Sequence, residues 1–341
     1  MASSSASHAP ASPLSNWGEI IRTQNLSSDR TMDGVSRWLL IVRASVFPMT
    51  ILSALVGGLL AAGAPGAHFG WFALALVGLV AAHAANNMIN DYFDLEGGVD
   101  SEGYVRTQYA PHPVLSGLIS KKGLLAAIAA VNLFDLGILV YLADARGWPV
   151  VAFALAGLFI SVFYVAPPFK LKHRGLGEPG VFLVWGPLMI GGTYFVTSGA
   201  FEPWVMLASV PYALLVTCVL MGKHIDKLEA DEEKGIHTLP VLLGRDRAVF
   251  LTQQLMVLFF VAIALLVLSG VLGVFTLLSF FAIPTLRKVL AVYNRPKPEA
   301  PPKGYPLWPL WYVSWAFVLT RTAGALFVGG LVLDAVFPLS L

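Results

Sequence analysis

The chain is poor in charged residues, in cysteine and in clustered basic residues. Only 12% of its 341 residues are charged, whereas 57% are hydrophobic, and the mean hydropathy is +0.72. Soluble domains carry roughly 25% charged residues, so a soluble chain of this composition could not cover its own surface. We therefore expect the apolar residues to face lipid. The net charge of +2 and the lack of a Lys/Arg-rich run exclude nucleic acid as an expected partner.

The single cysteine, Cys218, lies inside a hydrophobic stretch. One thiol can form neither an internal disulfide nor a multi-cysteine metal site, so we expect a buried structural thiol. Residues 1–35 are rich in Ser, Ala and Pro and lack the apolar core of a signal peptide. We interpret them as a disordered cytoplasmic leader, followed by a single transmembrane domain over residues 36–341.

What the chain does contain is a series of apolar stretches, each long enough to cross a hydrocarbon core of about 30 Å. We expect nine spans, or roughly eight to ten depending on how the last stretch is divided. They fall near residues 38–63, 69–90, 123–143, 149–168, 179–199, 203–222, 248–269, 271–293 and 306–337. The predicted fold class is an all-α integral membrane bundle.

The basic residues predict how this bundle is oriented. Lys and Arg lie in the N-terminal segment and in alternate links, whereas the opposite links contain only Arg146. Because Lys and Arg are retained on the cytoplasmic side of a membrane, the N-terminus and the long loops should be cytoplasmic. We expect the chain in the cell (inner) membrane, where an odd number of spans places the C-terminus on the outer side.

Acidic residues gather in two clusters at the same predicted end of the bundle, in residues 91–102 and 226–233. In the first, Asn87, Asp91 and Asp94 are spaced i, i+4 and i+7, which places them on one helix face. Clustered oxygen ligands suit Mg²⁺, which takes one or two carboxylates together with substrate phosphates. Asn90 is also costly at this depth unless a ligand uses it. The alternative is a solvated helix end.

Residues 87–100 resemble the first Asp-rich motif of the UbiA-type intramembrane prenyltransferases. They are most similar to the branch that prenylates 1,4-dihydroxy-2-naphthoate in menaquinone synthesis, and the resemblance extends over nearly the whole chain after the leader. It implies a bundle of nine helices around a central cavity. It also implies Mg²⁺-assisted transfer from a prenyl diphosphate to an aromatic acceptor.

Residues 223–244 resemble the second motif of this family, with one departure. Asp231 falls in the second Asp position, but Lys227 occupies the first, and Asp226 comes one residue early. In a regular helix five residues turn through about 500°, so Asp226 and Asp231 would diverge by about 140°. A bulge or loop could bring them together, or Asp226 could work with Glu229. A solvated charged loop is the alternative.

The resemblance implies a catalytic metal site built from both clusters. We expect the metal ligands to be Asn87, Asp91, Asp94, Asp226 and Asp231, of which the four aspartates are also the catalytic residues. We expect the substrate-binding residues to be Asn87, Asn90, Arg43, Tyr164 and Lys170.

Three of these residues have competing explanations. Arg43 lies inside the first span, where a lone charge is costly, so we expect it to pair with the acidic site rather than reach the interface. Lys170 could contact the diphosphate, although the positive-inside rule explains any cytoplasmic lysine, and we assign Lys172 to that rule. Tyr164 could stabilise an allylic cation or orient the acceptor, or anchor the helix at the interface. His112 falls where the family has Arg, and Arg106 could replace it.

Two kinds of alternative function stay open. In a cation-coupled secondary transporter the acids would lie near the bilayer midplane on broken helices, whereas here they follow helix ends. Within the family, the acceptor could be homogentisate, 4-hydroxybenzoate, a tetrapyrrole or a lipid. The expected partners are a prenyl diphosphate, an aromatic small molecule and membrane lipids.

Overall fold

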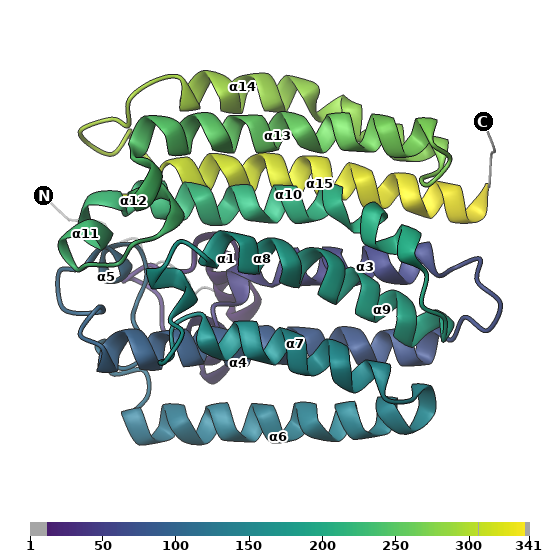
Figure 1. Cartoon of the computed structure of the whole chain (residues 1–341). Coiled ribbons are helices and arrows are strands. Elements are labelled where there is room, and N and C mark those ends of the chain that lie inside the picture. The colour runs from purple at the N-terminus through teal and green to yellow at the C-terminus, as the bar shows by residue number, and fades with distance from the viewer. Residues whose placement is uncertain (1–11, 306, 338–341) are drawn as a thin grey trace, which may run out of the picture.

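A computed structural model describes residues 12–305 and 307–337, and this part of the chain is helical with no β-strand. The long helices run along nearly one direction and stack in layers (Figure 1). Seven of them are long and apolar enough to cross a membrane: α4 (Phe69–Glu96), α6 (Lys121–Arg146), α8 to α9 (Gly177–Ser198), α10 (Pro203–Asp226), α13 (Arg245–Leu268), η4 to α14 (Val274–Tyr293) and α15 (Tyr312–Val336).

Two further expected spans have a different form. Helix α2 (Gly34–Ile41) and the segment formed by η1 and α3 (Ala44–Leu60) are bent by 64° and would together make an eighth span. Helix α7 (Pro149–Phe163) is apolar but has 15 residues, fewer than the roughly 20 that a straight span needs. The all-α membrane fold class is confirmed, whereas the count of nine spans stays a prediction.

The bend in the first span is built around Arg43. Helix α2 ends at Ile41, and Arg43 takes a left-handed conformation with φ of 55° before η1 begins. Such a break frees backbone carbonyls that water cannot satisfy inside a membrane. The side-chain Nδ2 of Asn87 donates to Val42 O at 2.9 Å, so α4 closes part of the break. The side chain of Arg43 is thereby directed at α4.

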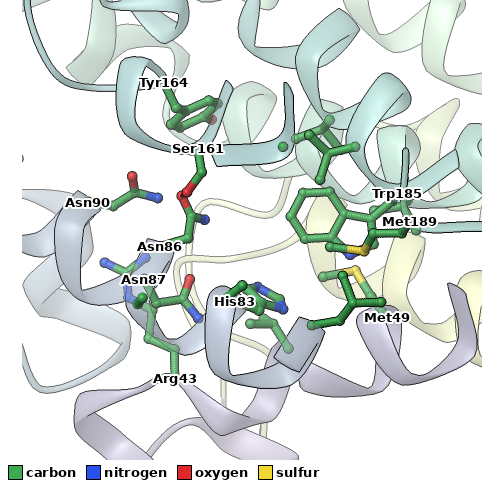
Figure 2. A pocket seen from close by; sticks show the side chains of 18 of the residues that line it. Arg43, Met49, His83, Asn86, Asn87, Asn90, Ser161, Tyr164, Trp185 and Met189 are labelled. Carbon is green, nitrogen blue, oxygen red and sulfur yellow. The ribbon is translucent and has the colours of Figure 1, made fainter. Parts of the chain in front are cut away.

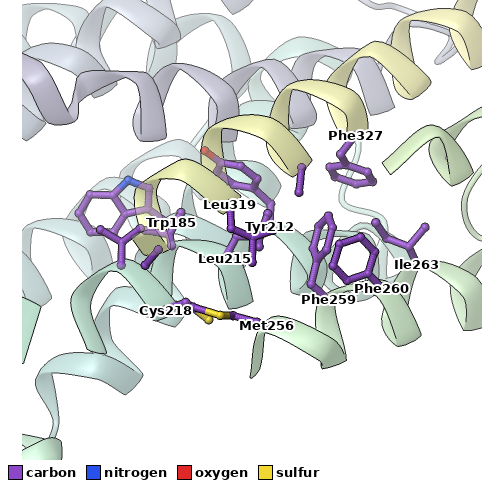
Figure 3. Close-up of a cluster of buried hydrophobic side chains, with 14 of the residues drawn as sticks. Trp185, Tyr212, Leu215, Cys218, Met256, Phe259, Phe260, Ile263, Leu319 and Phe327 are labelled. Carbon is purple, nitrogen blue, oxygen red and sulfur yellow. The ribbon is translucent and has the colours of Figure 1, made fainter. Parts of the chain in front are cut away.

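Helix α10 is the centre of the bundle. Its apolar window is 78% buried, whereas that of the peripheral helix α6 is 11% buried. It packs against α13 and α15 through a group of buried side chains that includes Tyr212, Phe259 and Phe327 (Figure 3). Cys218 lies in the same group, which confirms the expected buried thiol. Helices α10, α13 and α15 therefore form a closely packed side of the bundle.

The polar connections gather at one end of the bundle. Helices α5 (Val105–Tyr109), α11 (Leu228–Glu233) and α12 (Leu239–Leu243) lie together at the left of Figure 1. Helix α4 ends at the same side, as does α10. Both acidic clusters therefore lie at the same end of the molecule.

The prediction of a disordered leader over residues 1–35 is wrong for Pro13–Thr23, which form helix α1. Ser12 caps this helix by accepting a hydrogen bond from Ser15 N, and Pro13 occupies its first turn. Ile20 is fully buried in a cluster that contains Leu40 of α2. An apolar helix face thus offsets the polar composition on which the prediction relied. Residues 1–11 lie outside the described part of the chain.

Candidate active site

A cavity of about 830 Å³ lies within the bundle, between α4, α6, α7, α9, α10 and α15. Figure 2 shows that Asn90, Asn86 and Tyr164 lie toward one end of it, whereas Trp185 and Met189 lie further in. Along α4 the lining runs from Asn90 to Ala75, which is about 22 Å at 1.5 Å per residue. The walls beyond the polar end are mostly apolar. The cavity therefore suits a long apolar molecule with one charged end.

Asp91 is fully buried behind Arg43 and Arg106, which line the polar end, and is surrounded by positive charge. Arg43 forms an ion pair with it, with Nε at 3.2 Å from Oδ2 and Nη2 bonded to Oδ1. Arg106 Nε lies 3.4 Å from Oδ1, and His112 Nε2 lies 3.8 Å from it. The pairing expected for Arg43 is observed. Arg106 and His112 both lie beside Asp91, whereas the sequence analysis considered Arg106 as a replacement for His112.

Asp91, Asp100 and His112 form a buried group whose ligand atoms all lie within 4.8 Å of one another. Burial raises the pKa of Asp100, but its interaction with His112 and the charges of Arg106 and Arg43 outweigh burial and lower this pKa to about 2. The carboxyl of Asp100 is therefore ionised at neutral pH and available to a cation.

Asp94 lies one turn further along α4 and is held by a lysine. Lys172 Nζ donates to both carboxylate oxygens, at 2.7 and 2.8 Å, and this lysine is 5% exposed. Lys170, the lysine expected at the site, is exposed and does not line the cavity. The structure places Lys172, rather than Lys170, beside the site, because η2 (Leu171–His173) directs Lys172 inward.

The three asparagines of α4 all line the cavity. Asn86 Oδ1 accepts a hydrogen bond from Ser161 Oγ at 2.9 Å, which ties α4 to α7. Asn87 uses its Nδ2 on the backbone of Val42. The Oδ1 of Asn90 is buried without a hydrogen-bond donor, so it is an open acceptor directed at the polar end.

A chain of polar side chains leads from the cavity wall into the protein. Tyr164 lines the cavity, and its hydroxyl lies 3.4 Å from His224 Nε2. The other ring nitrogen of His224 lies 2.6 Å from Glu178 Oε1, and both residues are 1% exposed. A carboxylate, an imidazole and a phenol in this order can carry a proton away from a molecule in the cavity. Sequence reasoning placed Tyr164 here but missed the two residues behind it.

The fold brings the second acidic cluster next to the first. Tyr104 donates a hydrogen bond to Asp231 Oδ1. Lys234 Nζ donates to the backbone carbonyls of Gly98 and Val99 at 2.9 and 2.7 Å. Segments about 135 residues apart therefore share one end of the bundle, as the charge pattern predicted.

Within this second cluster, Lys227 lies between Asp231 and Tyr104. Its Nζ is 3.3 Å from Asp231 Oδ1 and 4.6 Å from the centre of the Tyr104 ring, and Lys227 is 6% exposed. Burial disfavours the charged forms of both Lys227 and Asp231, but the opposite charge of the partner outweighs this effect in each case. The pKa of Lys227 is therefore raised and that of Asp231 is lowered. Asp231 Oδ2 is buried without a hydrogen-bond donor.

Asp226 does not join the site, contrary to the sequence prediction. Its two oxygens accept hydrogen bonds from Tyr312 N and Val313 N, both at 3.0 Å, which are the first backbone donors of α15. Helix α10 ends at Asp226, and Lys227 separates it from α11, so the two acids are not on one helix. Glu229, the suggested partner, forms an ion pair with Arg245 instead.

The residues of the first cluster fit a divalent cation. Asp91 and Asp100 converge within 4.8 Å, and the buried oxygen of Asn90 lacks a donor. Mg²⁺ prefers such oxygen ligands and usually keeps further positions for water and phosphate. Cations pair with the acids of both clusters, so the number of carboxylates is what separates them: the second cluster offers Asp231 alone, because Asp226 binds the backbone of α15.

Comparison with known proteins decides the family. The model of the UbiA prenyltransferase family matches residues 50–303, which is most of the chain. The chain belongs to the UbiA prenyltransferase family. It is therefore a multi-pass membrane prenyltransferase, and the transporter alternative is set aside.

Individual UbiA-family proteins are similar at modest identity. A 2-carboxy-1,4-naphthoquinone phytyltransferase from Synechocystis sp. is 28% identical over 237 residues, which cover 69% of this chain and 74% of that protein. A 1,4-dihydroxy-2-naphthoate octaprenyltransferase from Bacillus subtilis is 25% identical over 200 residues, which cover 59% of this chain and 63% of that protein.

Solved structures of UbiA homologues share the fold. The homologue from Archaeoglobus fulgidus bound to GPP and Mg²⁺ aligns with a TM-score of 0.58 and 17% identity, covering 87% of this chain and 99% of that one. The apo homologue from Aeropyrum pernix K1 aligns with a TM-score of 0.64 and 19% identity, covering 85% and 98%. The helical arrangement is thus that of the UbiA family.

In this UbiA-family chain, the residues that sequence reasoning missed are mostly partners of predicted ones. Lys172, His224 and Glu178 each contact a predicted site residue or its neighbour. A sequence signal existed for Glu178, since a charge close to the start of an apolar helix needs a partner. No local pattern distinguishes Lys172 from Lys170.

Proposed function

We propose that this enzyme transfers a prenyl group from a prenyl diphosphate to 1,4-dihydroxy-2-naphthoate in an Mg²⁺-dependent reaction. The observation that carries the proposal is the apolar cavity of about 830 Å³ whose polar end is lined by Arg43 and Arg106, the partners of Asp91. This end adjoins the recess that Asp94 and Lys172 line. Two relatives whose names specify naphthoate or naphthoquinone prenylation support this acceptor.

Asp91, Asp94 and Asp100 are the acids that would hold Mg²⁺, with Asn87 and Asn90 beside them. When bound, Mg²⁺ neutralises charge that develops on a departing diphosphate. The chain contributes further positive charge through Arg43, Arg106, Lys172 and Lys223, which line the polar end or the small recess beside it. These groups bind and orient the diphosphate.

The remaining residues act on the other substrate and on water. Tyr164 faces the cavity and orients the aromatic acceptor. As its oxygen takes the proton that the acceptor hydroxyl releases, its own O–H proton passes to His224 Nε2, and Glu178 stabilises the imidazolium that forms. The apolar walls formed by residues such as Trp185 and Met189 exclude water from the reacting carbon. A proton thus leaves the acceptor along side chains rather than through bulk solvent.

The length of the cavity sets an expectation for the donor. An extended isoprene unit adds four carbon–carbon bonds of about 1.5 Å, or about 5 Å along its axis. The cavity lining extends about 22 Å along α4, from Asn90 to Ala75, at 1.5 Å per residue. A donor of about four isoprene units fits this length.

The proposal includes a location. Residues 36–341 would form a single transferase domain in the cell inner membrane, with α1 packed on its surface. The basic residues favour an acidic end, an N-terminus and long loops in the cytoplasm, with the C-terminus outside.

The test is prenyl transfer in membranes that contain the expressed chain. Donors of two to eight isoprene units are supplied with Mg²⁺ and 1,4-dihydroxy-2-naphthoate, and products are identified by mass spectrometry against membranes that contain Asp91→Asn. A prenylated naphthoate that depends on Mg²⁺ and on Asp91 supports the proposal. Transfer only to homogentisate, 4-hydroxybenzoate, a tetrapyrrole or a lipid would replace the acceptor, and transfer to none of these would reject the function.

A further inference from the structure

The two halves of the active site offer different groups to a bound diphosphate. In the first half, the carboxylates of Asp91 and Asp100 converge beside His112, and Asn90 has a buried oxygen without a hydrogen-bond donor. In the second half, the position where the family motif usually carries an acid holds Lys227 instead. The two halves therefore differ in what they can bind, although the motif resemblance makes them look equivalent.

The ammonium of Lys227 points into the site rather than into solvent. Lys227 lines the small recess at the polar end together with Asp94, Asp100 and Lys172. It is 6% exposed, and its Nζ lies 3.3 Å from Asp231 Oδ1 and 4.6 Å from the Tyr104 ring centre. An acid and the face of an aromatic ring both stabilise a fixed cation.

A divalent ion at this position would have to compete with that cation. Asp231 Oδ1 is used by Tyr104 and by Lys227, which leaves Oδ2 as the open oxygen of this acid. Asp226 cannot supply a second carboxylate, because both of its oxygens accept backbone N–H groups of α15. Asp231 is thus the single carboxylate of this half, and a divalent ion bound to its Oδ2 would be repelled by the ammonium of Lys227, which lies 3.3 Å from its Oδ1.

We propose that Lys227 takes the place of a metal ion in the second half of the site, so that the enzyme binds a prenyl diphosphate with one divalent ion and one built-in ammonium. This inference rests on the proposed function and names how its diphosphate is held. Lys227 would donate hydrogen bonds to diphosphate oxygens while Asp231 and Tyr104 hold it in place. The first cluster would hold the single divalent ion.

The metal stoichiometry tests this directly. The purified full-length chain in lipid nanodiscs is titrated with Mn²⁺, in place of Mg²⁺, in the presence of a non-hydrolysable thio analogue of a prenyl diphosphate. Electron paramagnetic resonance counts the bound ions. One Mn²⁺ per chain is expected in the wild type, and two are expected in Lys227→Asp, which restores the paired acids. Two ions in the wild type would overturn the inference.

Binding of the analogue supplies a second measurement. In Lys227→Met the affinity should fall about 10- to 100-fold, the usual effect of losing one hydrogen bond to a charged group, while one Mn²⁺ remains. Lys227→Arg keeps the charge and should bind within a few-fold of the wild type. An unchanged affinity in Lys227→Met would also overturn the inference.

Lys121 offers a matched control. It too pairs with an acid, Glu96, and lies 5.7 Å from the centre of a tyrosine ring, that of Tyr92, but it is exposed and lines neither the cavity nor the recess. Lys121→Met should leave binding unchanged. If the wild type binds no prenyl diphosphate analogue at any metal concentration, the proposed function itself fails. Tight binding with two ions rejects only the role of Lys227.

Discussion

Replacing Lys172 by Met should impair the enzyme, whereas the same change at Lys170 should not. Lys172 is 5% exposed and donates to both oxygens of Asp94, at 2.7 and 2.8 Å. Lys170 is two residues away, exposed, and outside the cavity lining. The pair therefore separates a cation that acts in the site from one that only follows the positive-inside rule.

The least effect expected is the loss of one of the two hydrogen bonds to Asp94. A hydrogen bond to a charged group contributes about 1.5–3 kcal/mol, and removing Lys172 also leaves Asp94 without its partner. If about that much is lost from the transition state, kcat/KM falls about 10- to 100-fold. Lys170→Met should stay within about twofold of the wild type.

The assay is prenyl transfer in membranes with saturating Mg²⁺, with the amount of folded protein measured by fluorescence-detected size exclusion. Normalising to folded protein separates lost chemistry from lost expression. Equal activity of the two variants, or a larger loss in Lys170→Met, would refute the role assigned to Lys172.

Three further outcomes are expected. Asp226→Asn should lower the free energy of unfolding by about 1–2 kcal/mol, because it weakens the cap of α15. It should leave kcat within twofold of the wild type, and a large loss of kcat at an unchanged melting temperature contradicts this. Tyr164→Phe should lower kcat about 100-fold if its hydroxyl accepts the acceptor's proton, with little change in donor affinity by direct binding, and full activity would exclude that role. The pKa of Asp100 is lowered from 3.8 to about 2 in the fold, so its contribution of about 2 kcal/mol is complete above pH 4 and is lost as pH falls toward 2. Thermal unfolding of the wild type and Asp100→Asn across this range should converge at the acid end, and parallel curves would contradict the assignment.

The part of the first half that lies on α4 could be predicted from the sequence, whereas Asp100 and His112, which complete its buried group, lie beyond the end of this helix. Asn87, Asp91 and Asp94 keep their helical spacing within α4 (Phe69–Glu96), and the period of an α-helix fixes their common face. The pairing of Arg43 with Asp91 was also predictable, since a charge inside a span needs a partner.

The second half could not be predicted because its geometry depends on distant residues. Asp226 caps α15, which begins at Tyr312, 86 positions later in the chain. No local pattern indicates such a contact. Lys172 and Lys170 likewise differ only in how one 3₁₀ turn directs them.

The leader was a different kind of error. Composition indicated disorder over residues 1–35, yet Ser12 followed by Pro13 is a helix start that the sequence displays. Burial of Ile20 then holds the segment in place. Local capping signals were more informative here than overall composition.

The end of α10 at Asp226, with a new helix from Leu228, has a consequence for how the family diverges. Because a single residue, Lys227, joins the two helices, the residues of the second acidic motif do not have to continue the helical spacing of α10. Acids in this region can therefore shift by one position during evolution without disturbing the packed wall of α10.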